Sequence, residues 1–251
     1  MKKSFLFVGL LSVVGCANRH SQHVFGSDGS ETNRDTDTEV QISGDGDIAT
    51  ERPVYRATET VFTDLMTTKL EVSFDWNNAR LIGKETLTAK PHFYATDKLM
   101  LDAKGMEIKS VTMNGAARPF SYEKEVLTIT LDKTYQRTEN YTVVIDYIAK
   151  PDERLLEGSA AITSDKGLYF INPRGEDPNK MPQIWTQGET EASSVWFPTI
   201  DAPNVKTKQE MLITVEDKYT TLSNGKFMGS KKNPDGTRTD HWKQDLPHAP
   251  Y

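Results

Sequence analysis

The chain has 251 residues, which accommodates one large domain or two small ones and excludes a large multidomain enzyme within these residues. Hydrophobic residues make up 36%, enough for a core, while a net charge of −6 argues against general nucleic-acid binding, which needs a surplus of lysine and arginine on some face. The single cysteine excludes an intramolecular disulfide and a metal site built from several cysteines.

The chain begins with the pattern of an export signal. Lys2 and Lys3 precede an apolar run from Phe5 to Gly15, which is too short to span a membrane and suits the core of a signal peptide. The run that ends at Cys16 resembles the lipobox of bacterial lipoproteins. Residues 1–15 are thus predicted to be a lipoprotein signal peptide, and lipid on Cys16 to anchor the exported protein to a bacterial membrane, at the outer membrane or the periplasmic face. The alternative is an ordinary signal peptide with a chance cysteine.

The segment 16–50 is polar and acidic. Between Gly26 and Thr50 it carries seven acidic residues against Arg34 alone, so this stretch accounts for a charge of −6. It is rich in Ser, Thr, Asp and Gly and cannot bury enough apolar surface to offset the entropy of ordering it. We therefore expect a flexible tether between the lipid and a folded domain at residues 51–251.

From about Val54 the pattern changes to short runs in which apolar and polar residues alternate, which is typical of antiparallel sheets. The clearest runs are Leu70–Trp76, Arg80–Ala89, Leu99–Leu101, Glu107–Met113, Leu127–Leu131, Tyr141–Tyr147, Met211–Val215, Lys226–Ser230 and Arg238–Lys243. Asn114-Gly115 and Asn224-Gly225 are two-residue hairpin signals, and Asn233 to Gly236 is a longer turn. The sequence predicts an all-β fold, a large antiparallel β-sandwich or saddle-like domain.

The tract from Lys150 to Pro203 is rich in proline and polar residues, and only Gly167–Ile171 and Gln183–Trp185 look like strands there. Irregular loops on a rigid β-scaffold are where functional sites usually lie. Gln187 and Glu189, two residues apart in an extended segment, point to the same side and could jointly receive a cationic amine. The alternative from spacing alone is a solvated edge strand. Asp201, between prolines, is expected to serve a turn or cap rather than catalysis.

Motifs for independent catalysis are missing from the chain. A zinc site of the H-E-x-x-H type needs two histidines four residues apart on a helix with a glutamate between them, and the five histidines provide no such pair. There is also no G-x-S-x-G motif, no phosphate-binding glycine loop and no catalytic cysteine. We predict that this chain binds no metal and contains no catalytic residue of its own.

Several motifs occur together in a specific order. Thr186-Gln187-Gly188-Glu189 is followed by Phe197-Pro198-Thr199-Ile200-Asp201-Ala202-Pro203, and then by Ser223-Asn224-Gly225. This set resembles the amino-terminal domain of the aminopeptidase N family of zinc metallopeptidases, peptidase family M1. The resemblance covers most of residues 60–251, and although each motif is short, their combination and order are specific.

The resemblance implies a saddle-like β-domain that normally packs against a thermolysin-like zinc domain, with the glutamine of the T-Q-x-E element lining the substrate pocket and its acidic partner binding the free amino terminus of a peptide. These roles map onto Gln187 and Glu189. The chain departs from the family pattern at Ala192–Val195, where an alanine-arginine pair often precedes the F-P element, and it lacks the G-x-M-E-N and H-E-x-x-H motifs.

The leading hypothesis is therefore a lipid-anchored, substrate-recognition portion of a zinc aminopeptidase that removes N-terminal residues from peptides, truncated before its catalytic domain and inactive alone. The rival hypothesis is a non-catalytic surface lipoprotein whose β-module binds a peptide, a glycan or a partner protein. In that case aromatic residues such as Trp185 and Trp196 matter more than Glu189.

Overall fold

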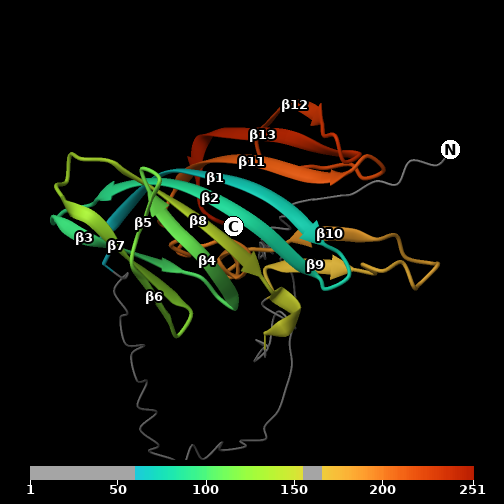
Figure 1. The fold of residues 1–251 in the computed structure, drawn as a ribbon, viewed down its shortest axis with the longest axis horizontal. Coiled ribbons are helices and arrows are strands. Elements are labelled where there is room, and N and C mark those ends of the chain that lie inside the picture. The colour runs from blue at the N-terminus through green and yellow to red at the C-terminus, as the bar shows by residue number, and fades with distance from the viewer. Residues whose placement is uncertain (1–59, 155–165) are drawn as a thin grey trace, which may run out of the picture. The chain divides into compact units, whose positions relative to one another are not determined.

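The computed structural model describes residues 60–154 and 166–251, so the predicted signal peptide, Cys16 and the acidic tether lie outside the described residues. The described part confirms the all-β prediction: it contains thirteen strands, two short 3₁₀ helices and no α-helix (Figure 1). No helix in these two ranges is long and apolar enough to cross a membrane. The elements are β1 (Thr63–Asp75), β2 (Arg80–Pro91), β3 (Thr96–Asp102), β4 (Met106–Met113), β5 (Ala116–Ala117), β6 (Phe120–Glu123), β7 (Val126–Tyr135), β8 (Tyr141–Ala149), η1 (Pro151–Glu153), β9 (Leu168–Ile171), β10 (Gln183–Thr186), η2 (Ser193–Val195), β11 (Thr207–Glu216), β12 (Lys226–Lys232) and β13 (Thr237–His248).

The strands form three sheets. An eight-stranded sheet has the order β12-β13-β11-β1-β2-β8-β4-β5, a three-stranded sheet the order β3-β7-β6, and β9 and β10 form a hairpin of their own. Every pair is antiparallel except β1 with β11, which run parallel with Leu70 opposite Met211. The sequence gives no sign of this parallel pair, because the two strands are joined through most of the domain rather than by a turn.

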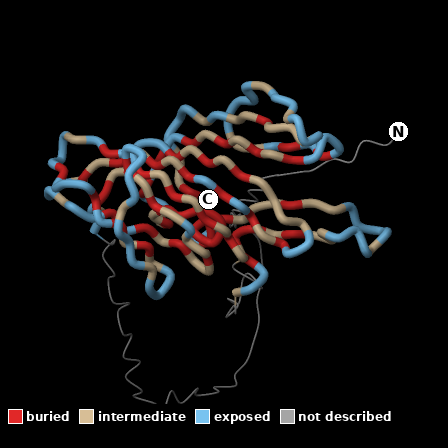
Figure 2. The backbone as a smooth tube through the Cα atoms, in the orientation of Figure 1, coloured by how far each residue is buried: buried red, intermediate tan, exposed pale blue. Residues whose placement is uncertain are grey.

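Alternation along the strands places the core on one face of the large sheet. In β1, Leu70 and Val72 are buried while the alternating Glu71 and Ser73 are partly exposed, and in β8 every second residue from Tyr141 to Ala149 is buried. The buried residues of β3 and β7 belong to the same cluster, so the small sheet covers part of the inner face (Figure 2). Period-two patterning thus decides which residues form the core.

Two of the three turn predictions are confirmed. Asn114 and Gly115, both with positive φ, connect β4 to β5, and Asn233–Gly236 connects β12 to β13. The prediction for Asn224-Gly225 is wrong, because β12 pairs with β13 and not with the preceding β11. Gly225 instead brings the chain close to β13: at φ of +87° a Cβ here would lie 2.1 Å from the carbonyl oxygen of Lys243.

One carboxyl group lies inside this core. Glu85 in β2 is fully buried, in phase with Leu81 and Leu87, and neither carboxyl oxygen has a hydrogen-bond partner among the residues that the structure describes. Burial raises the pKa of Glu85 well above its ordinary value. The neighbouring Gly83 leaves room for the buried Tyr147 ring, to which a Cβ would come within 2.3 Å. The centre of the large sheet therefore holds a carboxyl that favours its protonated form.

Candidate functional site

The predicted pair, Gln187 and Glu189, lies just after the last residue of β10 rather than in a strand. Gln187 is half-buried and its backbone N–H donates to the carbonyl oxygen of Gly167 at 2.9 Å, while Glu189 is exposed. Gly188 between them is buried, and a Cβ there would lie 2.2 Å from Ser193 Oγ and 2.7 Å from the backbone of Tyr251. Close packing at Gly188 thus fixes the backbone that carries the two polar side chains.

The segment after Glu189 folds back on itself through short-range contacts. The N–H of Ala192 donates to the carbonyl oxygen of Gly188 at 2.9 Å and starts the turn that leads into η2. Ser193 Oγ donates to the carbonyl oxygen of Pro250 at 2.8 Å, and Lys104 Nζ donates to that of Glu191 at 2.6 Å. The distant residues Lys104 and Pro250 therefore hold the loop that carries Glu189, one through its side chain and the other through its backbone.

Asp201 anchors the other end of this loop. Its Oδ2 accepts the N–H of Ser194 at 2.8 Å, and its own N–H donates to Asp102 Oδ2 at 2.9 Å. Burial raises the pKa of Asp201, although the hydrogen bond from Ser194 acts in the opposite direction. Thr199 and Asp102 also exchange two backbone hydrogen bonds, of 2.7 and 3.0 Å. These contacts agree with the expectation that Asp201 serves the loop's conformation.

A small apolar cavity of about 80 Å³ lies beneath the same loop. Its lining includes Thr186, Gly188 and Trp196 from the loop region and Val72, Leu81 and Met211 from the large sheet, but not Gln187 or Glu189. Binding pockets for small ligands usually measure about 300 to 1,000 Å³, so this cavity holds a few water molecules at most. Gln187 and Glu189 are presented outside this cavity.

The two tryptophans of the rival hypothesis are not free surface groups. Trp196 is buried in the core cluster, with its ring against Phe197 at a centroid distance of 4.4 Å. Trp185 is partly exposed and stacks on Tyr169 at 4.3 Å across the β9–β10 hairpin. The burial of Trp196 corrects its assignment as a binding residue on an exposed face.

The described histidines each have a partner other than a metal. His92 Nδ1 lies 2.5 Å from Asp64 Oδ1, His241 Nε2 lies 2.9 Å from Glu210 Oε1, and His248 Nδ1 lies 2.6 Å from the carbonyl oxygen of Ala249. Among residues 60–154 and 166–251, no three His, Cys, Asp or Glu side chains come together as a metal site requires. The residues present do not fit a zinc centre, and we derive no zinc-dependent step from them.

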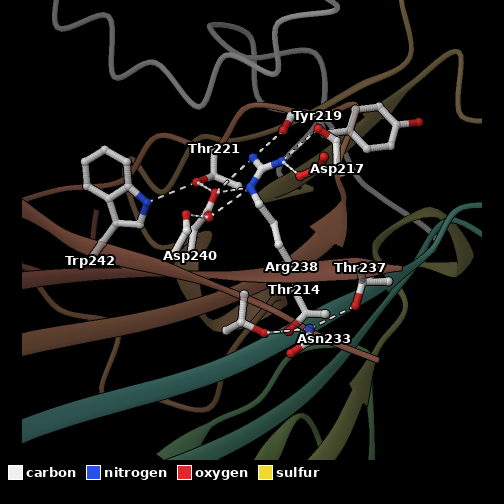
Figure 3. A network of polar contacts seen from close by, with 11 residues as sticks. Thr214, Asp217, Tyr219, Thr221, Asn233, Thr237, Arg238, Asp240 and Trp242 are labelled. Atoms are coloured by element: carbon white, nitrogen blue, oxygen red, sulfur yellow. Dashed lines mark hydrogen bonds and ion pairs between the residues drawn. The ribbon is translucent and has the colours of Figure 1, made fainter. Parts of the chain in front are cut away.

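A second cluster of charged side chains lies on β13 (Figure 3). Arg238 donates to Asp240 from Nε and Nη2, both at 3.0 Å, and from Nη1 to the carbonyl oxygen of Asp217 at 2.9 Å. Asp240 also accepts from Thr221 Oγ1 at 2.7 Å and from Ser230 Oγ. Burial acts to raise the pKa of Asp240, but the hydrogen bonds from Arg238, Ser230 and Thr221 outweigh it and the pKa lies below its ordinary value.

This cluster stabilises the β11–β13 edge of the sheet, because it joins β13 to the segment after β11. Trp242 Nε1 extends it by donating to Thr221 Oγ1 at 3.1 Å. The donors and acceptors are matched within the cluster, as buried polar networks require. The Arg238–Asp240 network is therefore a structural feature rather than a second candidate site.

The T-Q-x-E turn and the contacts that support it lie in a segment that matches a known protein family. Residues 62–251 match the family model described as the Peptidase M1 N-terminal domain. The chain belongs to the M1 peptidase family. A curated relative, human aminopeptidase B, is 28% identical over 105 residues, which is 42% of this chain and 14% of that protein.

Solved M1 structures share the fold. The M1 zinc metallopeptidase from Deinococcus radiodurans matches with a TM-score of 0.62 at 18% identity, over 75% of this chain and 40% of that one. Leukotriene A4 hydrolase from Saccharomyces cerevisiae matches with a TM-score of 0.55 at 19% identity, over 75% of this chain and 28% of that one. The chain thus spans less than half the length of these relatives.

Sequence patterns located the M1 turn but missed the residues that hold it. Lys104 and Asp102 reach the loop from a distant segment, Ser193 within the loop bonds to the distant Pro250, and nothing in their local sequence marks these contacts. The close approach at Gly188 had one signal, since a glycine between two polar residues often marks backbone that packs tightly.

Proposed function

We propose that this M1 N-terminal domain recognises the free amino terminus of a peptide through Glu189, with Gln187 beside it, and serves an aminopeptidase reaction. The observation that carries the proposal is an exposed carboxylate on a turn whose backbone is fixed by Gly188 and by the hydrogen bonds of Ser193 and Lys104. A fixed carboxylate binds an ammonium group through charge-assisted hydrogen bonds and sets the register of the peptide.

Ligands of a relative support the substrate class. A mutant of the Deinococcus radiodurans M1 zinc metallopeptidase has been solved with the peptide Tyr-Ser-Ala, and a mutant of a two-domain M1 zinc metallopeptidase with L-arginine. Both ligands carry a free α-amino group, which is the group that Glu189 is proposed to receive. At 18% identity, the likeness to that enzyme is one of fold.

The proposal assigns the zinc chemistry to residues outside this sequence. The 251 residues contain no H-E-x-x-H motif, and the described residues bring no metal ligands together. We expect the purified chain to show no hydrolysis of alanyl chromogenic substrates. A rate that is abolished by chelation would contradict this part of the proposal.

Amine recognition can be tested by binding alone. We expect Tyr-Ser-Ala to perturb the amide resonances of Gln187 and Glu189 in an NMR titration, and its N-acetylated form to leave them unchanged. Glu189→Gln should weaken binding about tenfold or more, because a hydrogen bond to a charged group contributes about 1.5 to 3 kcal/mol.

The matched control for this titration is Glu191→Gln. Glu191 is an exposed carboxylate in the same loop, and its recorded contact with Lys104 uses its backbone carbonyl rather than its side chain. Equal losses for the two variants would reduce the effect to general charge, and tight binding by Glu189→Gln would remove Glu189 from the site.

Membrane attachment through lipid on Cys16 is a second part of the proposal. It rests on the sequence pattern of residues 1–16, which ends a short apolar run at the only cysteine. We expect the mature chain to begin at Cys16 with an increased mass from lipid and to sediment with membranes. Cys16→Ser should abolish the added mass, and an unmodified wild-type cysteine would contradict lipidation.

A further inference from the structure

Three aromatic side chains gather at the end of the domain where the described chain begins. Phe62 is 67% exposed, Phe93 58% and Tyr94 80%. Phe62 lies just before β1 and the other two just after β2, and the N–H of His92 donates to the carbonyl oxygen of Phe62 at 2.9 Å. The two segments are thus joined side by side, and we call Phe62, Phe93 and Tyr94 the aromatic patch.

Polar and charged side chains contact the Phe93 ring of the aromatic patch. The His92 ring meets the Phe93 ring edge-on at 4.1 Å and pairs with Asp64 at 2.5 Å. Arg137 places its guanidinium carbon 5.5 Å from the centre of the Phe93 ring. Phe93 therefore packs against polar and charged side chains and remains largely exposed. Packing inside the domain does not explain why an aromatic residue occupies this position.

A group of exposed aromatic residues of this kind marks a contact surface, whereas single exposed apolar residues need no explanation. The local charge narrows the choice of partner. Lys90 and His92 both face the Asp64 carboxylate, and Arg137 has no ion pair among the residues that the structure describes. The Asp64 carboxylate offsets the charge of Lys90 and His92, so Arg137 is the cation beside the patch that no carboxylate pairs with among these residues.

We propose that the aromatic patch is a membrane-contact surface that docks the domain on an anionic lipid bilayer. Aromatic rings with a polar border are suited to the interface between lipid and water, and basic residues add attraction to anionic headgroups. The position in the sequence fits this partner. Phe62 lies near the N-terminal end of the domain, and the predicted lipidation site Cys16 precedes Thr60 by 44 residues. A lipid anchor and a membrane-contact surface together bind a membrane more stably than either does alone.

The proposal goes beyond amine recognition and is tested without it. The mature chain with Cys16→Ser carries no lipid, so any binding to vesicles of phosphatidylethanolamine and phosphatidylglycerol reports the protein surface. We expect this chain to co-sediment with such vesicles. The double variant Phe93→Ser and Tyr94→Ser should lower the partition coefficient about tenfold. Each substitution removes an aromatic ring whose apolar surface would be buried in the bilayer.

Two further variants separate the contributions. Leu246→Ser, which removes an exposed apolar side chain on β13, should leave the partition coefficient unchanged. Arg137→Gln should weaken binding to anionic vesicles and have little effect in about 1 M salt, where the Debye length is about 3 Å.

Three outcomes would overturn the proposal: no vesicle binding by the Cys16→Ser chain, equal losses for the patch and Leu246 variants, or a concentration-dependent dimer in sedimentation that the patch variant abolishes. The last result would assign the patch to a second copy of the chain. The peptide titration uses Glu189 and no vesicles, so failure of either experiment leaves the other intact.

Discussion

Two buried carboxyl groups in the large sheet, Glu85 on the central strand β2 and Asp240 on β13 near the edge, meet opposite environments. Glu85 is fully buried with no hydrogen-bond partner among the described residues, and its pKa is raised. Asp240 is also buried, at 3% exposure, but it lies nearer the edge of the sheet, accepts hydrogen bonds from Arg238, Thr221 and Ser230, and its pKa is lowered. Burial alone does not determine whether a carboxyl stabilises a fold; its partners do.

The largest effect on stability is expected from a substitution of Asp240. Asp240→Ala removes the partner of a guanidinium that is 14% exposed, and breaking such a buried pair costs about 3 to 5 kcal/mol. We expect the free energy of unfolding, measured by urea denaturation, to fall by about this amount. Asp240→Asn, which keeps one of the two acceptor oxygens, should lose less; an equal loss would show that the remaining oxygen contributes nothing without the charge.

At Glu85 the expected sign is reversed. Glu85→Met fills a similar volume with an apolar side chain, and it removes a carboxyl group without hydrogen-bond partners, which costs about 1 to 3 kcal/mol when buried. Urea denaturation at neutral pH should therefore show a gain of about 1 to 3 kcal/mol. A loss of stability would mean that the carboxyl contributes a favourable contact in the native state.

The pH dependence separates the two groups further. The folded pKa of Glu85 lies above its ordinary value of 4.5, so its contribution to stability is complete below pH 4.5 and is lost as pH rises from there to the folded pKa. The folded pKa of Asp240 lies below 3.8, so its contribution is complete above pH 3.8 and is lost as pH falls below it. Glu85→Gln should therefore reduce the slope of the unfolding free energy against pH by up to about 1.4 kcal/mol per pH unit, in the range between pH 4.5 and the folded pKa of Glu85. An unchanged slope would assign it to another group.

The smallest expected effect concerns a neutral member of the Asp240 network. Thr221→Val keeps the shape of the side chain but removes the hydrogen bonds to Asp240 and from Trp242. The free energy of unfolding should fall by about 1.5 kcal/mol, the low end of the range for a hydrogen bond to a charged group. A fall as large as that of Asp240→Ala would show that Thr221 organises the whole network.

Local patterning explains how much of this could be predicted. Alternation predicted the long core strands because one face of each is buried, and it even places Glu85 in phase with Leu81 and Leu87. It did not predict β5 and β6, which have no buried residue. A carboxylate in an alternating run is normally assigned to solvent, however, so its burial could not be anticipated. The turn with Gln187 and Glu189 was recognised from its motif.

The contacts that fix this turn could not be predicted, because they join residues that are far apart in the sequence. Lys104 reaches Glu191 and Ser193 reaches Pro250 only after the strands have paired. The hairpin signal at Asn224-Gly225 failed for the same reason. Local turn chemistry allowed a hairpin, but the long-range pairing of β12 with β13 decided the connection.

The parallel pairing of β1 with β11 has a consequence for the order of events during synthesis. Thr68 on β1 and Thr207 on β11 face each other across 139 residues of sequence. At roughly 5 to 20 residues per second, a ribosome takes on the order of ten seconds to produce the second strand after the first. Throughout that interval one edge of β1 lacks its native neighbour, and unpaired edges are sites of aggregation. The nascent domain therefore exposes an unpaired edge of β1 until β11 has emerged.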